Sequence, residues 1–435
     1  MVNRKSQIIN GRVLSNFFAL SIVQFANYLA PLIILPYLFR VLGPARYGLT
    51  ELARAISVYF LILTDYGFSL SATREISVHR DDPQRVSEVF SAVLLLKFLL
   101  VLLSVLVLSV IVFAIPKFRA QWPVYFLSFG NVIGMWLFPL WLFQGLERMK
   151  YIPLLNVTAK ALVVLGVFVL IRDTEDYLYA PLLQSAGTIL IGLAGLILAL
   201  AQFHVRFRLP SFGVLRRELV NGWHLFLSKM AITLYTTSNI VILGLLTNDT
   251  YVGYYAAGDK IVRAATDGLH VPLSQAIFPH IGRLASQSRP AALRFAATIV
   301  RLAGVATLGI SAGLYLAAPF LARLVMGEQF AAGVPVIRVL ALLPFIVALS
   351  NIFGIQIMAN FGLQRLLTRI LAAAGVLNFF LAVLLAEPLK HVGVAIASLS
   401  TEIVVTTAMF VALEKNGLHV FRAGRKDVDN QEADA

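Results

Sequence analysis

Four charged side chains stand close together in the stretch YVGYYAAGDKIVRAATDGLH, which covers residues 251–270. They are Asp259, Lys260, Arg263 and Asp267. Because Asp259, Arg263 and Asp267 follow one another at steps of four, a helix places all three on one face, where acid and base partly neutralise each other. A base on such a face can bind an anion, since arginine holds phosphate oxygens in pairs and lysine acts as a point charge. The spacing therefore predicts a helix face that binds an anion.

The motifs of common enzyme and metal sites are missing from the sequence. There is no G-x-x-x-x-G-K-[ST] phosphate loop and no H-E-x-x-H pair, the chain has no cysteine, and its seven histidines are scattered. The first motif would cradle nucleotide phosphates, and the second would hold a catalytic zinc ion. We therefore expect no catalytic residue, no metal and no cofactor, with H+ or Na+ as a possible coupling ion, and we interpret the chain as a transporter.

The four charges lie in a very apolar chain. Hydrophobic residues make up 59% of its 435 positions and charged residues only 13%, and the mean hydropathy is +0.82. Apolar runs such as residues 89–115 exceed the roughly 20 helical residues that cross a bilayer. The composition thus predicts an all-α polytopic membrane protein. The net charge of +14 is explained by basic cytoplasmic loops, so we expect no nucleic-acid partner.

Apolar segments of spanning length predict twelve transmembrane helices in two groups of six. The predicted spans are 13–39, 48–73, 86–115, 121–144, 151–171, 178–202, 218–246, 251–279, 302–320, 333–360, 370–386 and 391–413. The basic segment between the sixth and seventh spans contains Pro210 and Gly213 and divides the groups. The expected organisation is an N-terminal lobe at 1–203, an inter-lobe loop at 204–217, a C-terminal lobe at 218–413 and a polar tail at 414–435.

The basic residues predict the orientation of the chain. Segments on the side of the two termini hold roughly three times as many lysines and arginines as the segments on the other side. Such a bias predicts cytoplasmic N- and C-termini. A shift of 205 residues aligns Gly48 with Gly253 and Pro139 with Pro344, which favours two related halves.

Charged residues inside the predicted spans form the candidate site. The seven bases are Arg54, Lys97, Lys160, Lys229, Lys260, Arg263 and Arg338, and the five acids are Glu51, Asp65, Asp259, Asp267 and Glu402. For a single residue such as Lys97, a salt bridge that fixes helix packing is the simpler interpretation. As a group, the bases exceed the acids, and a membrane site with surplus positive charge suits an anionic substrate.

Three stretches resemble one family of membrane proteins. PYLFRVLGPARYGL (36–49), LILTDYGFSLSATREISVHRDD (61–82) and NDTYVGYYAAGDKIV (248–262) are similar to the polysaccharide-biosynthesis flippases. These are the Wzx-type exporters of lipid-linked oligosaccharides in the multidrug/oligosaccharidyl-lipid/polysaccharide (MOP) superfamily. The resemblance runs over nearly the whole chain.

The resemblance implies two pseudo-symmetric six-helix lobes around a central cavity in the bacterial inner membrane. Members of the family move an undecaprenyl-diphosphate-linked glycan, such as an O-antigen, capsule or exopolysaccharide unit, from the cytoplasmic to the outer face by alternating access. Ion-gradient coupling is proposed for several of them. The implied partners are this glycolipid, membrane lipids and other polysaccharide-assembly proteins.

The family offers no fixed catalytic motif, so the site residues are assigned from chemistry and position. Lys229, Lys260 and Arg263, supported by Arg54 and Lys160, are expected to bind the diphosphate and acidic sugars. Sugar hydroxyls would bond to the polar side chains Gln24, Asn27, Tyr235 and Asn239. In the empty protein the bases would pair with three acids, Asp65, Asp259 and Asp267. One of these acids could also carry a coupling proton.

Alternative functions stay open at this stage. A multidrug or metabolite antiporter of the same superfamily would be expected to have an acidic site if its substrates are cations. A peptidoglycan-precursor flippase also handles a lipid diphosphate, but would be expected to have more than twelve spans. A membrane glycan polymerase or ligase would need larger outer loops than the dozen residues or fewer predicted here.

Overall fold

The computed structural model describes residues 2–149, 152–203 and 205–421, and their side chains except at 2–30, 32, 231, 235, 269–273 and 275–276. Throughout these ranges every regular element is a helix, which confirms the all-α prediction. The chain forms two compact units that meet at Thr233 and Leu234, inside one helix. The sequence placed the division in the loop at 204–217, so the predicted lobe boundaries stay a prediction.

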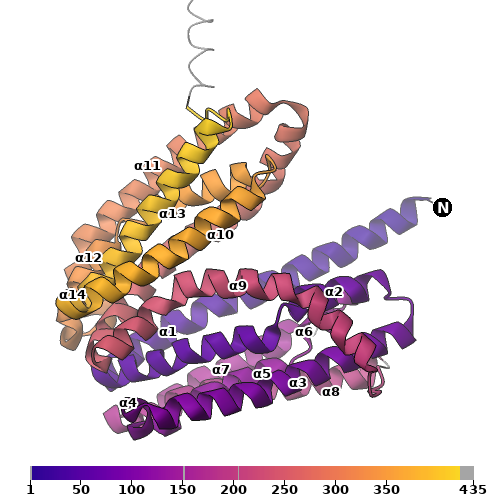
Figure 1. Cartoon of the computed structure of the whole chain (residues 1–435), viewed down its shortest axis with the longest axis horizontal. Helices are drawn as coiled ribbons and strands as arrows, with labels where there is room; N and C mark the ends of the chain where they lie inside the picture. The colour runs from indigo at the N-terminus through magenta and orange to yellow at the C-terminus, as the bar shows by residue number, and fades with distance from the viewer. Residues whose placement is uncertain (1, 150–151, 204, 422–435) are drawn as a thin grey trace, which may run out of the picture. The chain divides into compact units, whose positions relative to one another are not determined.

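The first unit is a layer of long helices joined by short ones (Figure 1). α5 packs on α8 and α1, and α7 packs on α1 and α8. Its elements are α1 (Val2–Asp65), α2 (Phe68–Val78), α3 (Pro83–Ala114), α4 (Pro116–Ala120), α5 (Trp122–Leu137), α6 (Leu140–Gly145), α7 (Ile152–Leu170), η1 (Thr174–Leu178), α8 (Tyr179–Gln202) and the first part of α9 (Phe212–Leu246).

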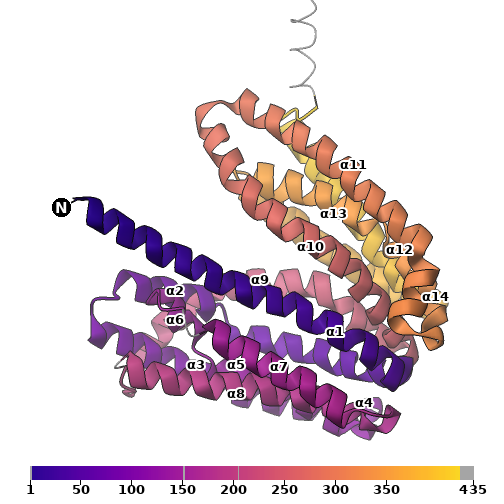
Figure 2. The ribbon, with the colours of Figure 1, turned by 180° about the vertical axis from the view of Figure 1, so that it is seen from behind.

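α1 folds back on itself, as Figure 2 shows. The backbone leaves the helical region at Gly43, where φ is 66° and ψ is 174°. The rings of Phe39 and Tyr47 lie 4.7 Å apart, whereas residues eight apart in a straight helix are about 12 Å apart. Glycine tolerates the positive φ, and the following Pro44 begins the second limb. The first predicted span, 13–39, falls on the first limb. The second, 48–73, was wrong in its end, because it covers the second limb but continues across the break after Asp65 into α2.

The segment after α8 lies along α3. The backbone N–H groups of Arg206 and Arg208 donate to the hydroxyls of Ser87 and Ser91, at 3.2 and 3.0 Å. Val205 is buried in the same core as Phe90. These bonds satisfy backbone groups that no helix satisfies, and they fix where α9 begins.

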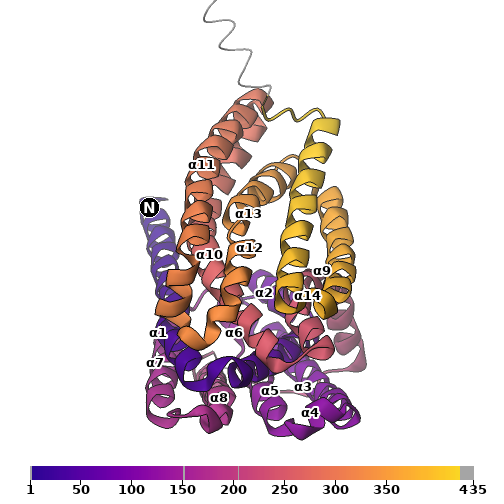
Figure 3. The same ribbon diagram turned by 90° about the vertical axis from the view of Figure 1, so that its left-hand side faces the viewer.

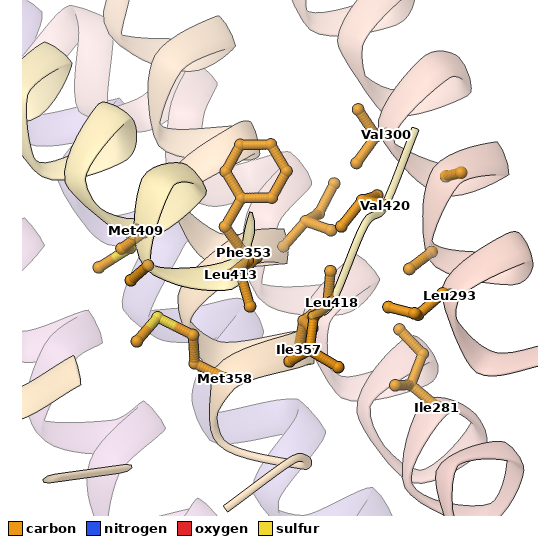
Figure 4. Packing of buried hydrophobic residues seen from close by; sticks show 14 of the residues in the cluster. Ile281, Leu293, Val300, Phe353, Ile357, Met358, Met409, Leu413, Leu418 and Val420 are labelled. Atoms are coloured by element: carbon orange, nitrogen blue, oxygen red, sulfur yellow. The ribbon is translucent and has the colours of Figure 1, made fainter. Parts of the chain in front are cut away.

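The second unit has its own core, seen close up in Figure 4. Buried apolar side chains come from several of its helices and from Leu418 and Val420 after the last one. Its elements are the rest of α9, α10 (Asp249–Gln287), α11 (Arg289–Leu321), η2 (Ala322–Met326), η3 (Glu328–Gly333), α12 (Val334–Leu340), α13 (Leu343–Asn351), η4 (Ile352–Met358) and α14 (Gln364–Lys415).

α14 also reverses direction, and its two limbs run side by side in Figure 3. Lys390 has a non-helical backbone with φ 53° and ψ −132°, just after Pro388. The Thr401 hydroxyl donates to Asn378 Oδ1 at 3.4 Å, although 23 residues of straight helix span about 35 Å. The last two predicted spans fall on the two limbs.

By length and composition, eight helices of the described chain could cross a membrane, or nine if the bent α9 is one span. This establishes a multi-pass membrane protein with fewer such helices than the twelve spans predicted. Part of the difference is physical, because α14 enters the count once although it folds back. The span counted on α1 begins at Ile33 and runs through α2 to Val78, so most of the first predicted span lies outside it. α10 is not among the eight, and it carries the four charges from Asp259 to Asp267.

Candidate functional site

A charged cluster in the first unit joins three helices that are distant in sequence. Asp65 ends α1, and its Oδ2 accepts a hydrogen bond at 2.6 Å from the Lys229 ammonium of α9. Its Oδ1 lies 3.7 Å from the Lys97 ammonium of α3 and accepts the Ser69 hydroxyl of α2. We call these four residues the Asp65 cluster.

The cluster is basic, and its exposure is uneven. One carboxylate faces two ammonium groups, so the formal charges of the three leave one positive charge. The Lys97 side chain is 6% exposed and that of Asp65 is 20% exposed, whereas that of Lys229 is 35% exposed. A buried charge is stable only with a partner, so Lys97 needs Asp65 more than Lys229 does. Lys229 is therefore the base that can change partners.

The D-Y-G-F sequence explains why the three helices meet. Tyr66 and Gly67 both have positive φ, at 46° and 84°, so α1 ends at Asp65 and α2 starts afresh at Phe68. A Cβ on Gly67 would lie 2.8 Å from the carbonyl oxygen of Gly222, and one on Gly222 would lie 2.6 Å from that of Tyr66. The two glycines let α9 touch the break. Lys229 follows two turns along α9 and reaches Asp65.

Other predicted bases have partners on their own helices. Arg263 donates to Asp259 within α10 at 2.7 Å, which is the i, i+4 pairing that the spacing allowed. Arg54 donates to Glu51 within α1 at 2.8 Å. Such pairs neutralise charge locally and need no assembled tertiary structure.

The side chain of Asn239 forms hydrogen bonds inside the second unit. It is 3% exposed, its Nδ2 donates to the Tyr255 hydroxyl at 3.2 Å, and its Oδ1 accepts from Asn378 at 2.9 Å. Asn378 in turn accepts from Thr401. We call these four residues the Asn239 network. They join α9, α10 and both limbs of α14.

The remaining predicted residues are placed individually. Lys160 on α7 and Lys260 on α10 are half-buried, and Asp267 on α10 is exposed. Lys229 belongs to one unit, and Lys260 and Arg263 to the other, so their joint binding of one substrate stays a prediction. Three predicted side chains lie outside those that the structure describes: Gln24, Asn27 and Tyr235.

Sequence reasoning missed the place of Lys97 in this site. It identified Lys97 as a deeply placed base but favoured a packing role for it, and it did not pair it with Asp65. No local signal links residues 32 positions apart on different helices. Among the residues that the structure describes, no three His, Asp or Glu side chains gather closely enough to hold a metal ion.

Comparison with known proteins gives a consistent set of relatives. A protein-family profile described as "Polysaccharide biosynthesis protein" matches residues 13–285. A protein of Escherichia coli (strain K12) named "Putative O-antigen transporter" is 31% identical over 408 residues, covering 93% of this chain and 97% of the relative. A protein of the same name from Shigella dysenteriae is 28% identical over 402 residues, covering 92% and 99%.

Solved structures share the fold. An inward-facing multidrug resistance MATE family transporter of the MOP superfamily superposes with a TM-score of 0.68 at 15% identity, covering 91% of this chain and 96% of the other. The lipid II flippase MurJ, in an inward closed conformation, gives 0.67 at 12% identity, with coverage of 93% and 87%. At such identities the likeness concerns the fold alone.

Proposed function

The chain belongs to the polysaccharide biosynthesis protein family, and we propose that it is a transporter that moves an undecaprenyl-diphosphate-linked oligosaccharide across the bacterial inner membrane. The cargo would be the repeat unit of an O-antigen, a capsule or an exopolysaccharide. The family membership agrees with the resemblance to Wzx-type flippases of the MOP superfamily. The curated relatives carry the name of an O-antigen transporter over nearly their whole length, which supports this cargo class.

The observation that carries the proposal is the basic surplus of the Asp65 cluster. In the empty protein Lys229 is held by Asp65. An arriving diphosphate offers several anionic oxygens and replaces Asp65 as the partner of Lys229. Asp65 then keeps Lys97 and Ser69, so no buried carboxylate is left without a partner. Because Lys97 keeps Asp65 paired, the exchange leaves no buried charge alone. Lys97 is therefore added to the predicted site.

Other bases and polar groups extend this site in the proposal. Arg263 and Lys260, with Arg54 and Lys160, contact phosphate or acidic sugars. Asp259 holds Arg263 until substrate arrives. Asp267 is proposed to do the same for the bases of α10. Sugar hydroxyls bond to Gln24, Asn27 and Tyr235. Asn239 is hydrogen-bonded inside the second unit, so transport in this proposal does not depend on it.

The transport cycle follows the same family reasoning. We propose twelve spans, cytoplasmic termini, alternating access and coupling to a gradient of H+ or Na+, with no cofactor. The reversals at Gly43 and Lys390 support the count, because they divide α1 and α14 into two limbs each. A coupling proton is proposed to be carried by one of the three acids Asp65, Asp259 and Asp267.

The rival functions fit the cluster less well. A carrier of cationic drugs needs an excess of acid where its substrate binds, whereas here one acid faces two bases. A polymerase or ligase needs groups that activate a sugar hydroxyl, and the Asp65 cluster holds its only carboxylate in two ion pairs. Recognition of a lipid diphosphate, in contrast, needs positive charge, which the two lysines of the Asp65 cluster supply.

Deletion and complementation test the proposal. In a strain that lacks the gene, lipid-linked repeat units should accumulate on the inner face of the membrane and the surface glycan should disappear. The wild-type gene should restore export and Lys229→Ala should not. The matched control is Lys415→Ala, which removes one exposed lysine at the end of α14. Normal surface glycan in the deletion strain would overturn the proposed function.

A further inference from the structure

Three aromatic side chains lie against one another beside the Asp65 cluster. The rings of Tyr66 and Phe226 are stacked, with centroids 5.0 Å apart and planes at 11°. Trp223 lies 5.9 Å from Phe226 and 6.3 Å from Tyr66. We call Tyr66, Trp223 and Phe226 the aromatic platform. All three belong to the first unit.

The platform is supported on one side and open on the other. Phe68 lies 5.4 Å from Tyr66 and is completely buried, so it forms the base. Trp223 is 45% exposed and leaves aromatic surface free. Tyr66 is held at a φ of 46°, a backbone conformation that a bulky residue adopts only when its surroundings impose it. Here α9 packs against this turn, because a Cβ on Gly222 would lie only 2.6 Å from the Tyr66 carbonyl oxygen.

Phe226 of the platform and Lys229 of the cluster lie on the same helix face. Phe226 precedes Lys229 by three residues, which puts both on one face of α9. On the other side, Tyr66 directly follows Asp65, the partner of Lys229. An anion bound by Lys229 therefore lies on the helix face that carries Phe226, next to the residue that precedes Tyr66.

We propose that the aromatic platform is the binding subsite for the first sugar of the cargo, the pyranose attached to the diphosphate. This inference rests on the proposed function. The C–H bonds on one face of a pyranose are polarised by ring and hydroxyl oxygens, and they are attracted to the negative face of an aromatic ring. When Lys229 holds the diphosphate, the sugar bonded to that diphosphate lies within reach of the rings.

An anchoring role at the membrane surface is the competing explanation, because Trp and Tyr are common at both faces of a bilayer. Such an anchor needs neither a stacked Phe226 nor a strained Tyr66, and it has no reason to share a helix face with Lys229. Trp122, which is 50% exposed in the same unit and packs on Phe126, offers a matched tryptophan away from the cluster.

Binding measurements with two probes separate these explanations. The full-length protein in lipid nanodiscs is titrated with undecaprenyl diphosphate, and with the glycolipid extracted from the deletion strain. Trp223→Leu and Phe226→Leu should each weaken glycolipid binding roughly 2- to 10-fold, the range measured for aromatic contacts. Neither should change the binding of undecaprenyl diphosphate. Trp223→Phe should recover most of the loss, and Trp122→Leu should change neither.

The outcomes distinguish the inference from the function on which it rests. Equal glycolipid affinity in wild type and both platform variants overturns the sugar subsite while the proposed function stands. An equal loss for both probes also overturns it, because the platform would then act on the lipid diphosphate or on the fold. If the wild-type protein binds neither probe, the proposed function fails and the subsite fails with it.

Discussion

The two units treat buried polar groups differently. In the first, Asp65 joins lysines from two other helices. In the second, Arg263 pairs with Asp259, one turn away on the same helix, α10. The Asn239 network, which links the helices of the second unit, consists of amides and hydroxyls.

This difference separates contacts that form within one helix from contacts that need the assembled unit. A pair within one helix forms as soon as the helix does, and it eases insertion into the membrane. A neutral network fixes packing and attracts no ion. An ion cluster between helices forms only in the assembled unit, and a stronger anion can take over one of its bases. The exchange at Lys229 therefore depends on the assembled first unit, whereas an exchange at Arg263 only opens a pair within one helix.

The largest expected effect is on the stability of the cluster. Asp65→Asn leaves Lys97 buried without a counter-charge and should lower the free energy of unfolding by about 3 kcal/mol. The double variant Asp65→Asn/Lys97→Met should recover most of this, because it removes both buried charges. Thermal unfolding of the purified protein measures both variants. Glu175→Gln, at an exposed salt bridge with Arg46, is the control, and a similar loss there would contradict the prediction.

The second largest effect is expected at the contact between α9 and the break after α1, which brings Lys229 to Asp65. Gly222→Ala puts a Cβ about 2.6 Å from the Tyr66 carbonyl oxygen, so α9 must shift away from the helix break. We expect a loss of roughly 1–3 kcal/mol in stability together with reduced export. Gly309→Ala on α11, where a Cβ meets nothing within 4 Å, should be neutral or stabilising. Equal behaviour of the two variants would refute the close-contact account.

A change of similar or smaller size is expected in the second unit. Asn239→Ala leaves Tyr255 and Asn378 without their partner and should cost about 1–3 kcal/mol of stability. Export for each folded molecule should stay near the wild-type rate. Unfolding curves and export normalised to protein level measure the two effects. A large loss of glycolipid affinity with unchanged stability would instead favour the sugar-binding role predicted for Asn239.

The smallest effect on stability concerns Lys229. Because its side chain is 35% exposed and Asp65 keeps Lys97, Lys229→Ala should change the free energy of unfolding by less than about 1 kcal/mol. The same melting experiment checks this. A loss as large as that of Asp65→Asn would mean that Lys229 holds the fold together.

The sequence predicted what depends on local spacing. The helical membrane fold follows from the apolar runs. A step of four placed Asp259 and Arg263 on one helix face, although the sequence left open whether they pair with each other, as they do in the structure. The D-Y-G-F motif pointed to the family, but the motif alone did not show that Tyr66 and Gly67 end a helix.

Contacts between distant segments could not be predicted in this way. Asp65 and Lys229 are 164 residues apart, and only the docking of α9 at Gly222 makes them neighbours. The same holds for the bonds of Asn239, whose sequence neighbours give no sign of Asn378. The reversals of α1 and α14 lie between predicted spans, at Gly43 and Lys390. Within the described residues, eight helices, rather than twelve, meet the criteria of length and composition.

The exchange of Asp65 for a diphosphate at Lys229 is tested most directly by the affinity of the purified protein for undecaprenyl diphosphate. Lys229→Ala should weaken binding roughly tenfold or more, as expected for the loss of a charged hydrogen bond, while Lys415→Ala leaves it unchanged. Wild-type affinity in the Lys229→Ala protein would contradict the account.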